Sequence, residues 1–362
     1  MKLKTGYLAA ISLAAALILE LGCGPALVIR FPKFPEQTGG ELRRVMQGRR
    51  KVGIVAVKPR DPTMLQRMGY TEDWSATVEA AVNAAISRRG YYTLIDVASR
   101  RDRLTELAYT QSGMTDQQKT IGQELATDGL LFIQMTNQPR QECKTEMVTS
   151  AMAVAGNLLS MAVSKGQARQ QDTTVPTGAL FLTVFIQAKL TNIETGQTVI
   201  FSVNKPFKLV NEAGNTECPS TLAAFNGALE QASTDIADNL SPNVVEQHIV
   251  LLDDVDDLDS NVADRIEKYL KAGNKWAESQ EYEMAAEQWQ NALNESGYQS
   301  LSALWNMAVY KWYSGDMETA EKYFTQALKR GGPDFMDGNK AEIWRDFRTE
   351  RKRMLEAGES GS

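Results

Sequence analysis

The side chains of this chain that are best suited to covalent or metal chemistry are three cysteines and one histidine: Cys23, Cys143, Cys218 and His248. A thiol can be acylated or oxidised to a disulfide, and its thiolate can ligate a metal ion. One histidine cannot build a His-rich metal site, and we interpret His248 as an isolated surface side chain. The sequence also lacks HExxH, GxSxG, P-loop and GxGxxG motifs. These absences predict a protein that is not an enzyme and holds no metal.

The N-terminal residues predict a role for the first cysteine, Cys23. Two lysines lie within the first four residues, and an apolar run that is broken only by Ser12 covers residues 8–19. A bilayer-spanning helix needs about 20 apolar residues, so this run predicts a cleaved signal peptide over residues 1–22. Cys23 directly follows a small residue, as in a lipobox, although Glu20 replaces the usual apolar residue. We predict lipid attachment to Cys23 and anchoring to a membrane; an ordinary signal peptide with an incidental cysteine is the alternative.

The other two cysteines form a candidate pair. They occur in similar settings, Gln-Glu-Cys143-Lys-Thr-Glu and Thr-Glu-Cys218-Pro-Ser, each just beyond an expected strand or extended segment. In an exported chain with an odd number of cysteines, one cysteine cannot belong to an intramolecular disulfide. The ends of neighbouring strands satisfy the Cα spacing that a disulfide needs. We therefore predict a Cys143–Cys218 disulfide, with two separate thiols as the alternative.

The elements that position these cysteines belong to an α/β domain over residues 51–250. Strands that alternate with helices predict a mostly parallel sheet with helical crossovers. The expected elements are a strand at 52–57, a helix at 75–89, a strand at 91–97, a helix at 115–126, a strand at 130–135, a hairpin at 179–193 and 198–203, and a helix at 220–240. A period of two predicts that Leu180, Leu182, Val184, Ile186, Ala188 and Leu190 share one face of the hairpin. The last helix has a predicted buried stripe of Leu222, Phe225, Leu229, Ala232 and Ile236.

Three segments lie outside or between these elements. Residues 23–50 contain several prolines without sustained periodicity, which predicts a lipidated, extended tether. Residues 138–178 are predicted to be an insertion containing an uncharged helix from Met147, which either packs on the domain or contacts the membrane. Residues 251–261 carry five aspartates without the glycine and closing glutamate of a calcium loop, which predicts a solvated acidic linker.

The last part of the chain, residues 262–357, contains an internal repeat with a period of 35 residues. Small and aromatic residues at equivalent positions are predicted to pack the repeats together: Ala285, Trp289 and Ala292, then Ala320, Phe324 and Ala327. This period is close to the tetratricopeptide period of about 34 residues, and a final helix at 341–355 is expected to cap the stack. The pattern predicts an all-α tetratricopeptide-like domain that binds a protein partner.

The charge balance limits the partners. The chain has 39 Lys and Arg against 45 Asp and Glu, a net charge of −6. A surface that coats a polyanion needs a basic excess, so nucleic acid is excluded as a partner.

Six short stretches carry a resemblance to a known family. They are Phe-Pro-Lys-Phe-Pro at 31–35, Gly-Tyr-Tyr-Thr-Leu-Ile-Asp at 90–96, Glu142-Cys143-x-Thr145-Glu146, Pro176-Thr177-Gly178, Glu194-Thr195-Gly196, and Glu217-Cys218-Pro219-Ser220. On these motifs the chain resembles the forty-one-kilodalton LipL-type outer-membrane lipoproteins of leptospires, a haemin-binding family of spirochaetes. The resemblance implies haemin as a cofactor and Cys143 and Cys218 as its candidate sites. Iron is ligated by a thiolate, so a disulfide would compete with this role.

The order of the elements also resembles the periplasmic domain of the CsgG curli-secretion lipoproteins. The fold class expected is therefore α/β, with a CsgG-like sheet, followed by an all-α domain. We expect a non-catalytic, self-associating scaffold or binding module that is lipid-anchored at the outer membrane and forms homo-oligomers. A haemin-binding surface lipoprotein and a CsgG-like secretion or channel component are the alternatives.

Overall fold

The computed structural model describes residues 27–97 apart from 60, 62, 67, 68 and 72, residues 126–149, and residues 174–359 apart from 256, 257 and 337. The predicted signal peptide, Cys23 and most of the helix expected at 115–126 lie outside these residues. The chain divides into two compact units. Residues 34–243 form an α/β unit, and the described residues 27–33 and 244–359 form a helical unit. The predicted fold class, α/β followed by all-α, is confirmed.

The α/β unit is built on a six-stranded mixed sheet. Its strand order is β3 (Thr93–Ile95), β2 (Lys51–Val57), β4 (Gly129–Thr149), β5 (Thr174–Asn192) and β6 (Thr198–Val203), and β7 (Pro206–Val210) also pairs with β5. β2 runs parallel to both β3 and β4, whereas β5 is antiparallel to β4, β6 and β7. The expectation of a mostly parallel sheet is therefore wrong. Only β2, β3 and the start of β4 have the parallel arrangement, and every pair that β5 forms is antiparallel.

The alternation along β5 decides which of its faces is buried. The six residues predicted to share a face are each 2% exposed or less, which confirms the predicted period of two: Leu180, Leu182, Val184, Ile186, Ala188 and Leu190. The turn between β5 and β6 is fixed by Asn192, whose side chain accepts hydrogen bonds from the backbone N–H groups of Glu194 and Thr195 at 2.9 and 3.1 Å. Gly196 completes the turn with a φ of 73°.

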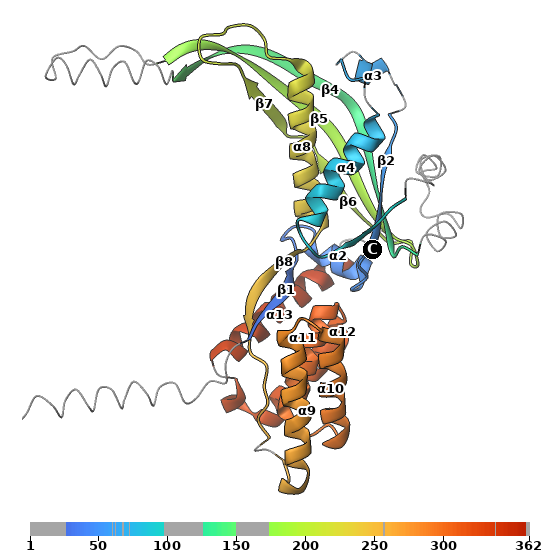
Figure 1. The fold of residues 1–362 in the computed structure, drawn as a ribbon, viewed down its shortest axis with the longest axis vertical. Coiled ribbons are helices and arrows are strands. Elements are labelled where there is room, and N and C mark those ends of the chain that lie inside the picture. Colours follow the sequence, from blue (N-terminus) through green and yellow to red (C-terminus); the bar gives the residue numbers. More distant parts are fainter. Residues whose placement is uncertain are drawn as a thin grey trace, which may run out of the picture. The chain divides into compact units, whose positions relative to one another are not determined.

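Two long helices, α4 (Trp74–Ser87) and α8 (Thr221–Leu240), lie side by side on one face of the sheet (Figure 1). Asp73 and Ser220 cap them by accepting hydrogen bonds from the backbone N–H groups of Ser75 and Ala223. The predicted stripe of α8 is buried at Phe225, Leu229, Ala232 and Ile236. Leu222 differs: its side chain, in the first turn of the helix, is 39% exposed.

The described part of the predicted extended tether, residues 27–50, contains a strand and a helix. Leu27–Lys33 form strand β1 and Gly39–Met46 form helix α2; α3 (Thr63–Gln66) is a further short helix of the α/β unit. Phe31 is 1% exposed, and Leu42 and Val45 are fully buried. The prolines of this segment predicted extended chain and gave no sign of the strand. An edge strand nevertheless tolerates a proline whose missing N–H faces away from the partner strand.

The helical unit consists of antiparallel helix pairs. Its elements are β8 (Asn243–Ile249), α9 (Ser260–Glu278), α10 (Tyr282–Glu295), α11 (Leu301–Ser314), α12 (Met317–Gly331), the short helix η2 (Pro333–Phe335) and α13 (Gly338–Glu359). β8 pairs with β1, so the α/β unit is inserted in the chain between two strands of the helical unit. The unit boundaries thus lie at residues 33–34 and 243–244, and differ from the predicted 51–250 and 262–357.

The six residues assigned to repeat packing lie on α10 and α12 and are at most 2% exposed: Ala285, Trp289, Ala292, Ala320, Phe324 and Ala327. Trp289 packs directly on Gly273, where an added Cβ would lie 2.4 Å from the indole nitrogen. In the second pair, Phe324 packs edge-on against Trp305 at 5.1 Å between ring centroids. A glycine therefore accepts the aromatic residue in the first pair, whereas a second aromatic ring packs against it in the second pair.

The acidic segment before α9 is only partly a solvated linker. Asp253, Asp254 and Asp259 are exposed, but Leu251 is 5% exposed. The buried side chain of Asn306 clamps the backbone of Leu252, accepting from its N–H at 2.8 Å and donating to its carbonyl at 2.7 Å. Two backbone groups are thereby satisfied inside the unit, which fastens this segment to α11. The aspartates predicted a solvated linker, but the neighbouring apolar residues Leu251 and Leu252 hold the segment in the unit.

Phe31→Ala should destabilise the helical unit by about 3–5 kcal/mol, because it removes an aromatic side chain from a buried site. Urea unfolding followed by tryptophan fluorescence measures this, since Trp74 is the one tryptophan outside the helical unit. Val28→Ala is the matched control: Val28 lies on the same strand and is 49% exposed, so we expect a change of about 0.5 kcal/mol or less. Equal effects of the two substitutions would contradict the packing of β1 in this unit.

Candidate functional site

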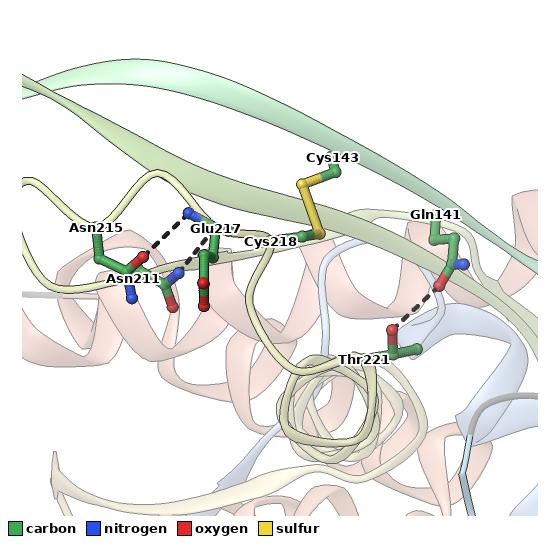
Figure 2. The surroundings of a disulfide bond; sticks show 7 residues. All are labelled: Gln141, Cys143, Asn211, Asn215, Glu217, Cys218 and Thr221. Atoms are coloured by element: carbon green, nitrogen blue, oxygen red, sulfur yellow. Dashed lines mark hydrogen bonds between the residues drawn. A yellow bond between two sulfur atoms is a disulfide. The ribbon is translucent and has the colours of Figure 1, made fainter.

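A disulfide joins the hairpin of the α/β unit to the loop that precedes α8. Cys143 lies on β4, Cys218 lies two residues before the N-cap of α8, and their Cα atoms are 5.9 Å apart (Figure 2). The Cα separation is within the usual range for such bridges. The predicted pairing is confirmed, and the alternative of two separate thiols is wrong.

Hydrogen bonds on both sides of the disulfide fasten the same loop (Figure 2). Asn211 donates from its amide to the carbonyl of Glu217 at 2.8 Å, and the backbone N–H of Glu217 donates to the side chain of Asn215 at 3.0 Å. On the other side, the Thr221 hydroxyl lies 3.4 Å from the side-chain oxygen of Gln141 on β4. The loop is therefore held by its own asparagines as well as by the disulfide that joins it to β4.

Gly178 permits the close approach of this loop to β5. An added Cβ at Gly178 would lie 1.7 Å from the carbonyl oxygen of Glu217, so no other residue fits there without moving the backbone. The N–H of Gly178 donates to the carbonyl of Asn215 at 2.7 Å, and its carbonyl accepts from the N–H of Asn211 at 3.0 Å. Because Thr145 of β4 is the cross-strand partner of Gly178, three of the sequence motifs meet at this one place.

The disulfide corrects the assignment of haemin-binding roles to Cys143 and Cys218. Both sulfurs are bonded to each other, and ligation of haem iron by cysteine requires a free thiolate. The role found for these residues is structural. His248, which we interpreted as a surface side chain, lies exposed on β8, in the helical unit.

The segment predicted as an insertion over residues 138–178 extends the hairpin at both of its described ends. Residues 138–149 continue β4 and residues 174–178 begin β5, so the helix expected from Met147 does not start there; residues 150–173 lie outside the described part. The outer part of β4 is mostly polar and exposed, so it has no alternation from which a strand could be recognised. Register shifts around Asn137 mark a bulge where β4 leaves β2.

Beyond Gln134, β4 pairs with β5 alone among the described residues, which leaves one edge of the strand open from Met135 to Thr149. Across the three strands β4, β5 and β7, cationic side chains lie over an aromatic ring of β5. The Nζ atoms of Lys144 and Lys208 are 5.4 and 5.6 Å from the ring centroid of Phe181. Lys208 also forms an ion pair with Glu146. The site thus combines unpaired strand backbone with a charged, partly aromatic surface.

Within the described ranges, no group of three or more His, Cys, Asp or Glu side chains is placed to hold a metal ion. The helices of those ranges also include none with the length and apolar character needed to cross a bilayer.

No protein-family model matches the chain, and no curated protein matches its sequence. Among solved structures, it is similar to the crystal structure of lipoprotein GNA1162 from Neisseria meningitidis, with 13% sequence identity and a TM-score of 0.23. That match covers 52% of this chain and 99% of the Neisseria chain. The LipL-type resemblance stays a prediction from short motifs.

Replacing both bridged cysteines, as Cys143→Ser with Cys218→Ser, should destabilise the α/β unit. The residues are 75 positions apart, and the chain-entropy model gives a loss of about 4 kcal/mol for such a loop. Hydrogen exchange of α/β-unit peptides along a urea series measures the loss. Reduction of the natural protein is the control and should give the same loss, whereas the double variant should not respond to reductant. Equal stability of oxidised and reduced protein would contradict a structural role.

Proposed function

We propose that this chain is an exported lipoprotein, acylated on Cys23 and held at the outer membrane, that acts as a non-catalytic, self-associating scaffold. The disulfide supports export, because such bonds persist in oxidising compartments. The signal-peptide pattern of residues 1–22 supports it independently. The observation that carries self-association is the open edge of β4.

An open edge offers N–H and carbonyl groups in the spacing that another strand needs. Among the described residues, β5 is the one strand that pairs with β4 from Met135 to Thr149, and Met147, which is 61% exposed, adds an apolar side chain near the end of the open edge. The hairpin is held in shape by the disulfide and by the loop around Gly178, so little order is lost when a second copy pairs with it. A second copy of this chain is the occupant that we propose.

The helical unit supports a scaffold role in a different way. Its repeats are of the kind that stack into extended binding surfaces for other proteins. Trp276 and Met284, on α9 and α10, are 40% and 41% exposed, whereas the residues that pack the repeats together are buried. In the proposal the α/β unit associates with other copies, while the helical unit binds a protein partner.

Two alternatives remain with distinct tests. Haemin binding, implied by the LipL-type resemblance, would need ligands other than the bridged cysteines; a Soret shift in unreduced protein would support it. A CsgG-like secretion or channel role would use the same association of copies, and ring-shaped particles with conductance in planar bilayers would support it. The proposed scaffold predicts association without either signal.

Met147→Lys should weaken association between copies at least about tenfold, because a buried strand edge would have to accommodate an unpaired ammonium group. Sedimentation velocity on the mature chain with Cys23→Ser measures this without lipid-driven aggregation. Met284→Lys is the matched control, since Met284 is also exposed but lies in the helical unit. A parent chain that stays monomeric up to the highest concentration at which it remains soluble would contradict the proposal, and so would equal weakening by both substitutions.

Cys23→Ser should move the chain from the membrane fraction to the soluble fraction. Lipid attachment contributes about 0.8 kcal/mol per buried methylene, so its loss removes nearly all of the membrane affinity. Detergent phase partitioning and the mass of the N-terminal peptide measure the outcome. Cys143→Ser with Cys218→Ser is the control and should remain in the membrane fraction. Recovery of an unacylated natural chain would contradict the lipoprotein proposal.

A further inference from the structure

The strand that follows the anchor cysteine belongs to the helical unit. β1 begins at Leu27, so three residues separate it from Cys23. The four steps from Cys23 to Leu27 span at most about 14 Å when fully extended. A free tether over residues 23–50 would instead have reached roughly 90 Å. The start of β1 at Leu27 thus limits how far this strand can be from the lipid.

β1 is fastened to the helical unit by side-chain packing and by backbone hydrogen bonds. Phe31 is 1% exposed, and its ring centroid lies 4.5 Å from that of Trp312. The backbone N–H of Arg30 donates to the Tyr282 hydroxyl at 3.2 Å, and that hydroxyl is 3.3 Å from the Arg30 carbonyl. Pairing with β8 completes the attachment (Figure 1). A segment held in this way is part of the fold and does not act as a tether.

We propose that β1 holds the helical unit directly at the membrane, with the phospholipid headgroup layer as the partner of its β1 end. This inference rests on the proposed acylation of Cys23. The outward-facing residues of β1 suit that environment, since Val28 is 49% exposed and Arg30 and Lys33 are exposed cations. Long cationic side chains reach headgroup phosphates while their stems cover apolar surface. Whatever the repeats bind, they bind next to the bilayer.

Photocrosslinking from the lipid headgroups tests the proposal. The mature acylated chain is placed in vesicles of phosphatidylethanolamine and phosphatidylglycerol, with a small fraction of phosphatidylethanolamine carrying a short aryl azide. Crosslinked peptides are then identified by mass spectrometry. A flexible Gly-Ser segment of about 20 residues, inserted between Ala26 and Leu27, should lower crosslinking to the helical unit about tenfold, because effective concentration falls steeply with linker length.

The matched control places the same Gly-Ser segment between Lys33 and Phe34. It lengthens the connection to the α/β unit and leaves the spacing from Cys23 to β1 unchanged, so crosslinking to the helical unit should not change. Both variants should keep the natural urea midpoint of the helical unit. Crosslinks confined to residues 34–243 would overturn the inference. So would a yield of crosslinks to the helical unit that the first insertion leaves unchanged.

The mass of the N-terminal peptide separates this inference from the lipoprotein proposal. If Cys23 carries no acyl groups, the lipoprotein proposal fails. The Cys23 thiol of the mature chain is then coupled to a phospholipid with a maleimide headgroup, and both insertions are repeated. Loss of crosslinking with the first insertion alone supports the placement by β1, and an equal response to both insertions refutes it.

Discussion

The pairing of β1 with β8 depends on the α/β unit returning its two ends to the same place. The Thr38 hydroxyl donates to the carbonyl of Asn239, which joins the first helix of that unit to the end of α8. A further bridge links Asn243 to Gly90. The strands that continue from these ends therefore emerge together. Without this closure, bringing β1 and β8 together across the chain from residue 34 to 243 would cost about 5 kcal/mol of chain entropy. That cost is comparable to the stabilisation that burial of Phe31 contributes.

How far the sequence predicts this molecule depends on whether a residue acts within its own element or across the chain. The alternation from Leu180 to Leu190 and the repeat of Trp289 as Phe324 report local burial, and they placed β5, α10 and α12 correctly. The cysteine count identified the disulfide, because oxidising conditions leave few fates for paired thiols. These signals need no knowledge of the partner segment.

The features that were missed all depend on a distant partner. Gly178 is required only because the Glu217 carbonyl approaches it, and Asn306 matters only because Leu252 lies against it. β1 opens on three consecutive apolar residues, which obscures its alternation, and its Phe31 packs against Trp312, far along the chain. The outer part of β4 is polar on both faces, so strand pairing there comes from the backbone rather than from a hydrophobic pattern.

The open edge of β4 also carries features that limit indiscriminate pairing. Pro139 removes one N–H, the register shifts around Asn137 twist the strand, and Lys144 places charge along it. Natural edge strands use these devices to prevent aggregation. They leave the edge able to pair only weakly between molecules that are free in solution. In the proposed scaffold the lipid confines all copies to one surface, which raises their effective concentration, so weak pairing suffices there. The features that limit pairing at the β4 edge and the lipid anchor then act together. The first prevent association before export is complete, and the anchor permits it at the membrane.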